Sequence, residues 1–145
     1  MQNSLKTYII ILTLISFLAS GIIFLIGPER LNSQQKEQSD ISAAKLQAAR
    51  EKAEYYDQQG DYTRALQYYF ECIRQADGLK KKEAAAWARN NAAYMLIKQH
   101  WKDPTTDLQP AKQLLEEALA LEGISSECQQ KIRSNLQYAL KFVRD

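Results

Sequence analysis

The sequence has few of the residues that interrupt helices. Its 145 residues include only three prolines and five glycines, whereas Ala, Leu, Gln, Glu and Lys dominate after residue 40. Proline and glycine are the least favourable residues in a helix interior, and those five residues are among the more favourable ones. The composition therefore predicts an all-α fold for residues 41–145, a length sufficient for a small helical core.

The sequence is equally poor in residues that build metal and nucleophilic sites. His100 is the only histidine, and no metal-ligand spacing surrounds it, which excludes a zinc site built around it. Cys72 and Cys128 lie 56 residues apart with no histidine near them in sequence, and they are either two buried thiols or a disulfide. A glycine-rich phosphate loop is also missing. We therefore predict that the protein is not an enzyme and takes no cofactor, metal or small-molecule substrate.

An excess of charge of one sign is missing as well. The chain has 19 Lys and Arg against 17 Asp and Glu, a formal net charge of +2. Such a balance provides no strong field to gather nucleic acid, and we predict no nucleic-acid partner. The basic run Lys80-Lys81-Lys82 is followed by Glu83, which favours a solvated surface over a binding site.

One long stretch lacks charge altogether. Tyr8 to Ile26 contains no charged residue, and its 19 residues span about 28 Å as a helix, close to the thickness of a bilayer core. We predict an N-terminal tail at 1–6, a transmembrane helix at 7–27 and a polar linker at 28–40. A cleaved signal peptide is the alternative, because Lys6 precedes the run and small residues occur at 19–21. The single hydrophobic run predicts a single-pass membrane protein. The short basic tail favours an orientation with the N-terminus in the cytoplasm and the 41–145 domain outside it.

Helical periodicity divides residues 41–145 into five helices. We expect them at 41–59, 61–78, 81–99, 110–123 and about 125–144, with Ser39-Asp40 capping the first and Ser126 with Gln129 forming a capping box for the last. The last helix would bury Ile132, Leu136, Ala139, Leu140 and Val143. Asp61, Tyr62 and Arg64 are interpreted as a helix cap, a packing aromatic and a solvated charge, because the turn at Gly60 explains them without chemistry.

Two of these helical hairpins repeat one pattern. Ala53 and Tyr56 recur 40 residues later as Ala93 and Leu96. The second helix of the hairpin recurs 46 residues later. Its Ala65, Tyr69 and Cys72 correspond to Ala111, Leu115 and Ala118. The same unit therefore occurs twice, with about six residues inserted between the helices of the second copy.

These residues resemble the tetratricopeptide repeat, a 34-residue helical hairpin with small residues at the helix crossing and Gly-Asp/Asn-Tyr at the turn. The first copy, at about 46–79, has the small Ala53, Ala65 and Cys72, the bulky Tyr56 and Tyr69, and the turn Gly60-Asp61-Tyr62. The second, at about 86–123, departs from the pattern by having His100 in place of the turn glycine and by its inserted loop. The resemblance implies a short α-solenoid of two hairpins followed by a capping helix.

The resemblance also implies a binding groove, because the first helices of successive repeats line the ligand-facing side in this family. Carried over residue by residue, the groove would contain Arg50, Glu54, Asp57, Trp87, Asn90, Asn91, Tyr94 and Lys98, with Trp101 in the inserted loop as a further contact. Aromatic area combined with side-chain donors suits a peptide site. We therefore expect a membrane-anchored module that binds a membrane-associated protein as a scaffold or assembly factor. The alternative is a permanent structural subunit of a larger membrane complex.

Overall fold

The computed structural model describes residues 40–143 of the chain. The predicted tail, transmembrane helix at 7–27 and most of the linker lie outside these residues. Among the described helices, none is both long and apolar enough to span a membrane. Ile41–Asp145 forms one compact unit.

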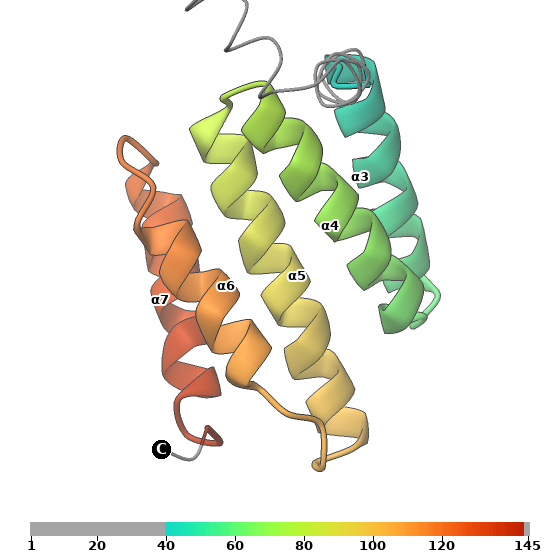
Figure 1. The fold of residues 1–145 in the computed structure, drawn as a ribbon. Coiled ribbons are helices and arrows are strands. Elements are labelled where there is room, and N and C mark those ends of the chain that lie inside the picture. Colours follow the sequence, from blue (N-terminus) through green and yellow to red (C-terminus); the bar gives the residue numbers. More distant parts are fainter. Residues whose placement is uncertain (1–39, 144–145) are drawn as a thin grey trace, which may run out of the picture. The chain divides into compact units, whose positions relative to one another are not determined.

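The described part is all-α, as predicted, with five helices and no strand. They are α3 (Ala43–Gln58), α4 (Tyr62–Gly78), α5 (Lys82–Lys102), α6 (Gln109–Leu119) and α7 (Ser126–Ala139). Each helix packs against the next one in the chain, and α5 also packs against α7 (Figure 1). This arrangement makes α5 the central helix, in contact with α4, α6 and α7.

The turn between α3 and α4 forms as the sequence predicts. Gly60 adopts a φ of +72°, a left-handed conformation that side chains disfavour, and it ends the first hairpin arm. Asp61 then caps α4, because its Oδ1 accepts a hydrogen bond from the backbone N–H of Arg64 at 3.1 Å. Pro110 lies in the first turn of α6, where its missing N–H costs no helical hydrogen bond.

Four predicted details at the helix ends were wrong. The cap of α3 is Ser42, whose Oγ accepts from the N–H of Lys45 at 3.2 Å, rather than Ser39 or Asp40. α5 continues to Lys102, three residues beyond the expected end, so Trp101 lies in its last turn and not in the following loop. α6 ends at Leu119 and α7 at Ala139, before the expected 123 and 144. Leu140 is consequently outside the helix and 50% exposed, contrary to the predicted burial.

The predicted capping box at Ser126 and Gln129 was also wrong. Ser125 caps α7 instead, and its Oγ accepts from the N–H of Cys128 at 3.2 Å. The choice between the two adjacent serines is a tertiary effect, because Glu83 of α5 accepts hydrogen bonds from both the N–H and the Oγ of Ser125, at 2.8 and 2.6 Å. Gln129 donates to the carbonyl of Ile124.

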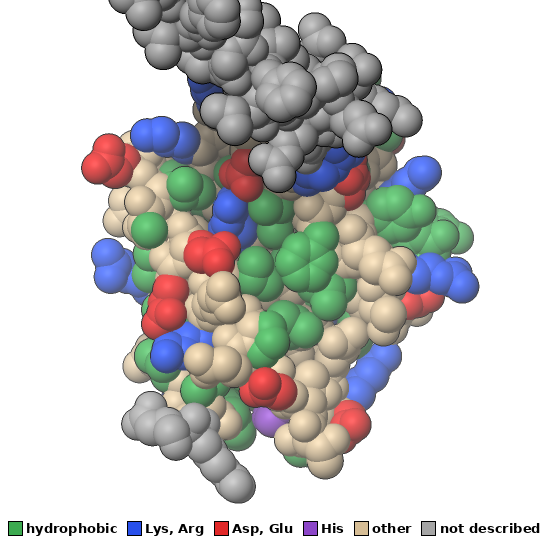
Figure 2. Space-filling model, in the orientation of Figure 1, with side chains coloured by type: hydrophobic (Ala, Val, Ile, Leu, Met, Phe, Trp, Pro, Cys, Tyr) green, Lys and Arg blue, Asp and Glu red, His purple; other side chains and the backbone are tan. Residues whose placement is uncertain are grey.

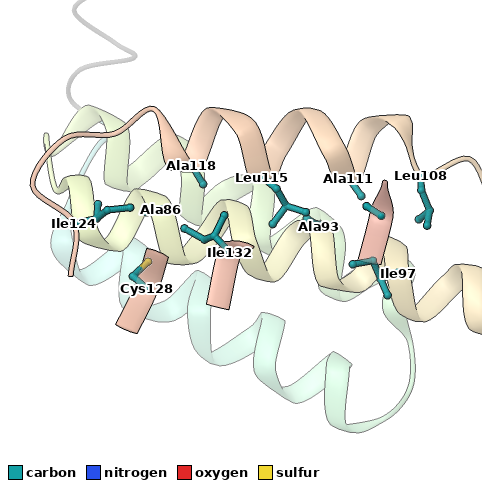
Figure 3. Packing of buried hydrophobic residues seen from close by; sticks show 11 residues of the cluster. Ala86, Ala93, Ile97, Leu108, Ala111, Leu115, Ala118, Ile124, Cys128 and Ile132 are labelled. Carbon is teal, nitrogen blue, oxygen red and sulfur yellow. The ribbon is translucent and has the colours of Figure 1, made fainter. Parts of the chain in front are cut away.

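The core consists of two clusters that meet at α5. One cluster lies among α3, α4 and α5 and includes Ala53, Ala65 and Tyr69. The other lies among α5, α6 and α7, where α5 contributes Ala86, Ala93 and Ile97 (Figure 3). α5 packs against other helices on several sides, and its many alanines are small enough to allow these helices to approach it closely.

The crossing of α3 and α4 gives a direct test of this packing. Ala53 and Ala65 are both fully buried. Leucine at Ala65 adds three carbons at a filled position, and we expect the Ala65→Leu variant to lose about 1–3 kcal/mol of unfolding free energy. Chemical denaturation of the full chain in detergent, followed by circular dichroism, measures the loss. The control is Ala48→Leu on the exposed side of α3, which should change stability by less than about 0.5 kcal/mol. Equal stability of the two variants would contradict the tight crossing.

Candidate binding surface

A cleft opens between α3 and α5, with α4 beneath it. Its volume is about 440 Å³, which is within the range of ligand pockets. Leu46, Ala84 and Ala88 supply apolar walls, and the side chains of Trp87, Arg50 and Asn91 also line the cleft. The cleft therefore combines an apolar interior with a guanidinium and an amide that can bind polar groups.

Trp87 is held in one orientation at the centre of this surface. Its Nε1 donates to Oε1 of Glu83 at 3.0 Å, one helical turn earlier. Hydrogen bonds from Ser125 and from this indole hold the pKa of the Glu83 carboxyl below its ordinary value. Trp87 also lines a second cavity of about 430 Å³, formed with Glu127, Gln130, Lys131 and Ser134 of α7. One fixed indole therefore forms part of two adjoining cavities.

Three aromatic residues recur at intervals of seven along α5: Trp87, Tyr94 and Trp101, which we call the α5 stripe. Two helical turns separate successive members, so each interval spans about 10.5 Å on the same side of the helix. Trp101 is 54% exposed, its ring lies 5.7 Å from that of Tyr94, and its Nε1 donates to the hydroxyl of Tyr138 at 2.7 Å. The stripe therefore presents partly exposed aromatic area along most of α5.

A chain of amides leads from the core to the cleft. Asn135 of α7 donates its Nδ2 to Oδ1 of Asn90 at 2.9 Å, and Asn90 donates in turn to Oδ1 of Asn91 at 3.2 Å. Asn90 is 1% exposed. Its predicted place on the ligand-facing side is therefore wrong, because the amide of Asn135 holds it in the core. Asn91 is partly exposed, and its Nδ2 makes no hydrogen bond within residues 40–143, so it can donate to a ligand.

The remaining predicted residues form ion pairs beside the stripe. Nε of Arg50 donates to Oε1 of Glu54 at 2.7 Å, and this carboxylate raises the pKa of the guanidinium. The ammonium of Lys98 binds the carboxylate of Asp57, joining α5 to α3. The Lys98–Asp57 pair is partly buried, whereas Arg50 and Glu54 are exposed and their pair contributes little to stability.

The two cysteines are free, buried thiols, and Cys72 lines the base of the cleft. Burial raises the pKa of each thiol to about 11, so both are protonated near neutral pH and are weak nucleophiles. His100 is also buried, with its Nδ1 at 3.0 Å from the carbonyl oxygen of Thr106. Within residues 40–143, no group of three His, Cys, Asp or Glu residues is placed to hold a metal ion.

The structure brings most of the predicted residues onto one surface and adds others. We call this surface, contributed by α3, α5 and α7, the inner surface; it comprises Arg50, Glu54, Asp57, Trp87, Asn91, Tyr94, Lys98, Trp101 and Lys131. Lys131 was not predicted for this surface, because its helix was expected to be a capping helix. Reasoning from the sequence also missed the apolar walls Leu46, Ala84 and Ala88. The recurrence of apolar residues along α3 and α5 was the available signal for these walls.

Comparison of the chain with protein-family models, with curated proteins and with solved structures found no match.

Proposed function

We propose that residues 41–143 are a tetratricopeptide-like module that binds a segment of another protein on the inner surface. The observation that carries the proposal is the cleft between α3 and α5, with the fixed indole of Trp87 on its wall. Large aromatic side chains held in place before binding lose little conformational freedom, and such residues often dominate binding energy.

Hydrogen bonding supports a peptide rather than a purely apolar ligand. Asn91 has a free Nδ2 beside the cleft, and its Oδ1 is already occupied by Asn90. The amide can therefore donate to a backbone carbonyl of a bound segment, which would otherwise lose a hydrogen bond to water on entering the cleft. Arg50 adds a second donor group at the same cleft.

The proposal includes the membrane segment predicted at 7–27. Attachment to a bilayer confines a binding module to the membrane surface, which raises its effective concentration toward partners in the same membrane. A role as a scaffold or assembly factor for a membrane complex follows from this confinement. The partner is then expected to be membrane-associated.

A permanent structural subunit of such a complex is the second candidate. One observation favours it. Hydrophobic side chains gather near the middle of the face viewed in Figure 2, and Phe70 of α4 is 47% exposed. In a permanent assembly such side chains would be buried against another subunit.

Crosslinking and affinity purification of the full chain from its native membrane test the proposal and separate the candidates. We expect a partner that crosslinks to the inner surface and that, in a sample without crosslinker, dissociates during sizing in detergent. A stoichiometric complex that survives sizing would support the permanent subunit instead. Crosslinks confined to residues away from α3, α5 and α7 would contradict the inner surface as the binding site.

A further inference from the structure

Three lysines, two on the inner surface and Lys102 beside it, lie next to the rings of Tyr62 and Tyr94. Nζ of Lys102 lies 4.2 Å from the ring centre of Tyr62, and Nζ of Lys98 lies 5.3 Å from the same ring and 4.9 Å from that of Tyr94. Nζ of Lys131 lies 5.8 Å from the Tyr94 ring. Lys102, Lys98 and Lys131, which we call the lysine row, therefore connect α5 to the start of α4 and to α7.

The lysine row carries more positive charge than its neighbours neutralise. Asp57 is the only carboxylate paired with the row within residues 40–143, and it binds Lys98. Lys102 donates to the neutral carbonyl of Gly60 at 3.1 Å, and no described carboxylate lies within 4.0 Å of Nζ of Lys102 or Lys131. Three ammonium groups thus form only one ion pair within residues 40–143, and the further carboxylate beside them, Glu127, lines the same cavity as Lys131 without pairing with it.

The charges around the row limit what can bind there. The inner surface beyond the row contains Glu54, and Glu83 and Glu127 line the two cavities beside Trp87. A polyanion such as nucleic acid would meet these carboxylates along its length and be repelled. A segment with a short cluster of negative charge can contact Lys98 and Lys102 while it avoids Glu54 and Glu83, so the charge pattern favours acidic side chains within a protein segment.

We infer that the segment bound by this protein is acidic, with carboxylate side chains near Tyr94 between Lys98 and Lys131 and an apolar side chain in the cleft beside Trp87. This inference rests on the proposed function. Trp87 and Tyr94 are about 10.5 Å apart along α5. Because an extended chain advances about 3.3 Å per residue, the apolar residue and the first acidic residue would be about three positions apart.

Selection from a library of random peptides tests the inference and requires no purified partner. The full chain in detergent is incubated with random 12-residue peptides that are acetylated at the N-terminus and amidated at the C-terminus, so that only side chains carry charge. We expect Asp and Glu to be enriched over the input library about three positions from an apolar residue. Binding of a selected peptide should weaken at least about tenfold between low salt and 0.5 M salt, because the Debye length shortens to a few ångströms.

Two double variants carry the same change in charge. Lys102→Glu/Lys131→Glu reverses two members of the lysine row and should abolish the acidic preference. Lys82→Glu/Lys141→Glu alters exposed lysines away from the row and should retain it. Circular dichroism of each variant shows whether the fold persists, and the salt dependence of the wild-type chain tests the inference without any variant.

The outcomes separate the inference from the proposed function. Selection of peptides whose binding depends on Trp87, but which show neither acidic enrichment nor salt dependence, would overturn the inference and leave the proposed function intact. If no selected peptide depends on Trp87 for binding, the result would contradict both the inference and the proposed function. Preferential competition by single-stranded nucleic acid would overturn the acidic protein segment as the ligand.

Discussion

Alanine at both Trp87 and Tyr94 is expected to abolish capture of the partner protein while the helical content of the chain stays unchanged. Both aromatic rings belong to the α5 stripe, and Trp87 lines the two cavities of the inner surface. Removal of a central aromatic contact commonly costs at least about 2 kcal/mol of binding free energy. For the pair we therefore expect affinity to fall at least about a hundredfold.

Affinity purification of the full-length variant, with the amount of retained partner compared to wild type, measures this effect. The matched control is Tyr55→Ala/Phe70→Ala, which removes two exposed aromatic rings outside the inner surface and should leave capture unchanged. Equal capture by wild type and the Trp87→Ala/Tyr94→Ala variant would refute the inner surface as the binding site. Loss of capture by the Tyr55→Ala/Phe70→Ala control alone would indicate that the partner binds the surface around these two rings and not the inner surface.

The Leu115→Ala variant is expected to lose about 2–5 kcal/mol of unfolding free energy. Leu115 is fully buried, and Figure 3 shows its side chain between α6 and α5, near Ala93. α6 has only 11 residues, and its other two buried residues are the small Ala111 and Ala118. Leu115 is thus the largest buried side chain that α6 contributes to the cluster it shares with α5 and α7.

Thermal unfolding of the full chain, followed by circular dichroism, should show a midpoint at least about 8 °C below that of wild type, since a domain of this size shifts by about 4–8 °C per kcal/mol. The control is Leu140→Ala, which makes the same chemical change at a half-exposed position after α7. It should shift the midpoint by no more than about 3 °C. Equal shifts for the two variants would contradict the assigned burial of Leu115.

Features predicted correctly from sequence depend on residues close together in the chain. The spacing of Ala53 and Tyr56 marks one side of α3, and Asp61 caps a helix that begins with the next residue. Such interactions span only a few residues, so they leave a direct pattern in the sequence. The existence and order of all five helices follow from patterns of this kind.

Features that the sequence pattern missed depend on contacts between distant residues. Ser125 rather than Ser126 caps α7, because Glu83 binds Ser125 from 42 residues away. Asn90 is buried rather than exposed, because Asn135 donates to it from 45 residues away. The capping box at Ser126 was read from four neighbouring residues and the place of Asn90 was carried over from the repeat, and neither pattern contains Glu83 or Asn135 as a partner.

The sequence by itself determined an all-α domain and the turn at Gly60 and Asp61, because backbone propensity and helical spacing are local properties, whereas the crossing of Ala53 and Ala65 was expected from the resemblance to the tetratricopeptide repeat. The tertiary structure alone decided which side chains share the inner surface. It placed Lys131 of α7 beside Tyr94 and left the Nδ2 of Asn91 free beside the cleft. The physical reason is that a binding surface is made where helices pack together, and their relative placement depends on side chains that are far apart in the chain.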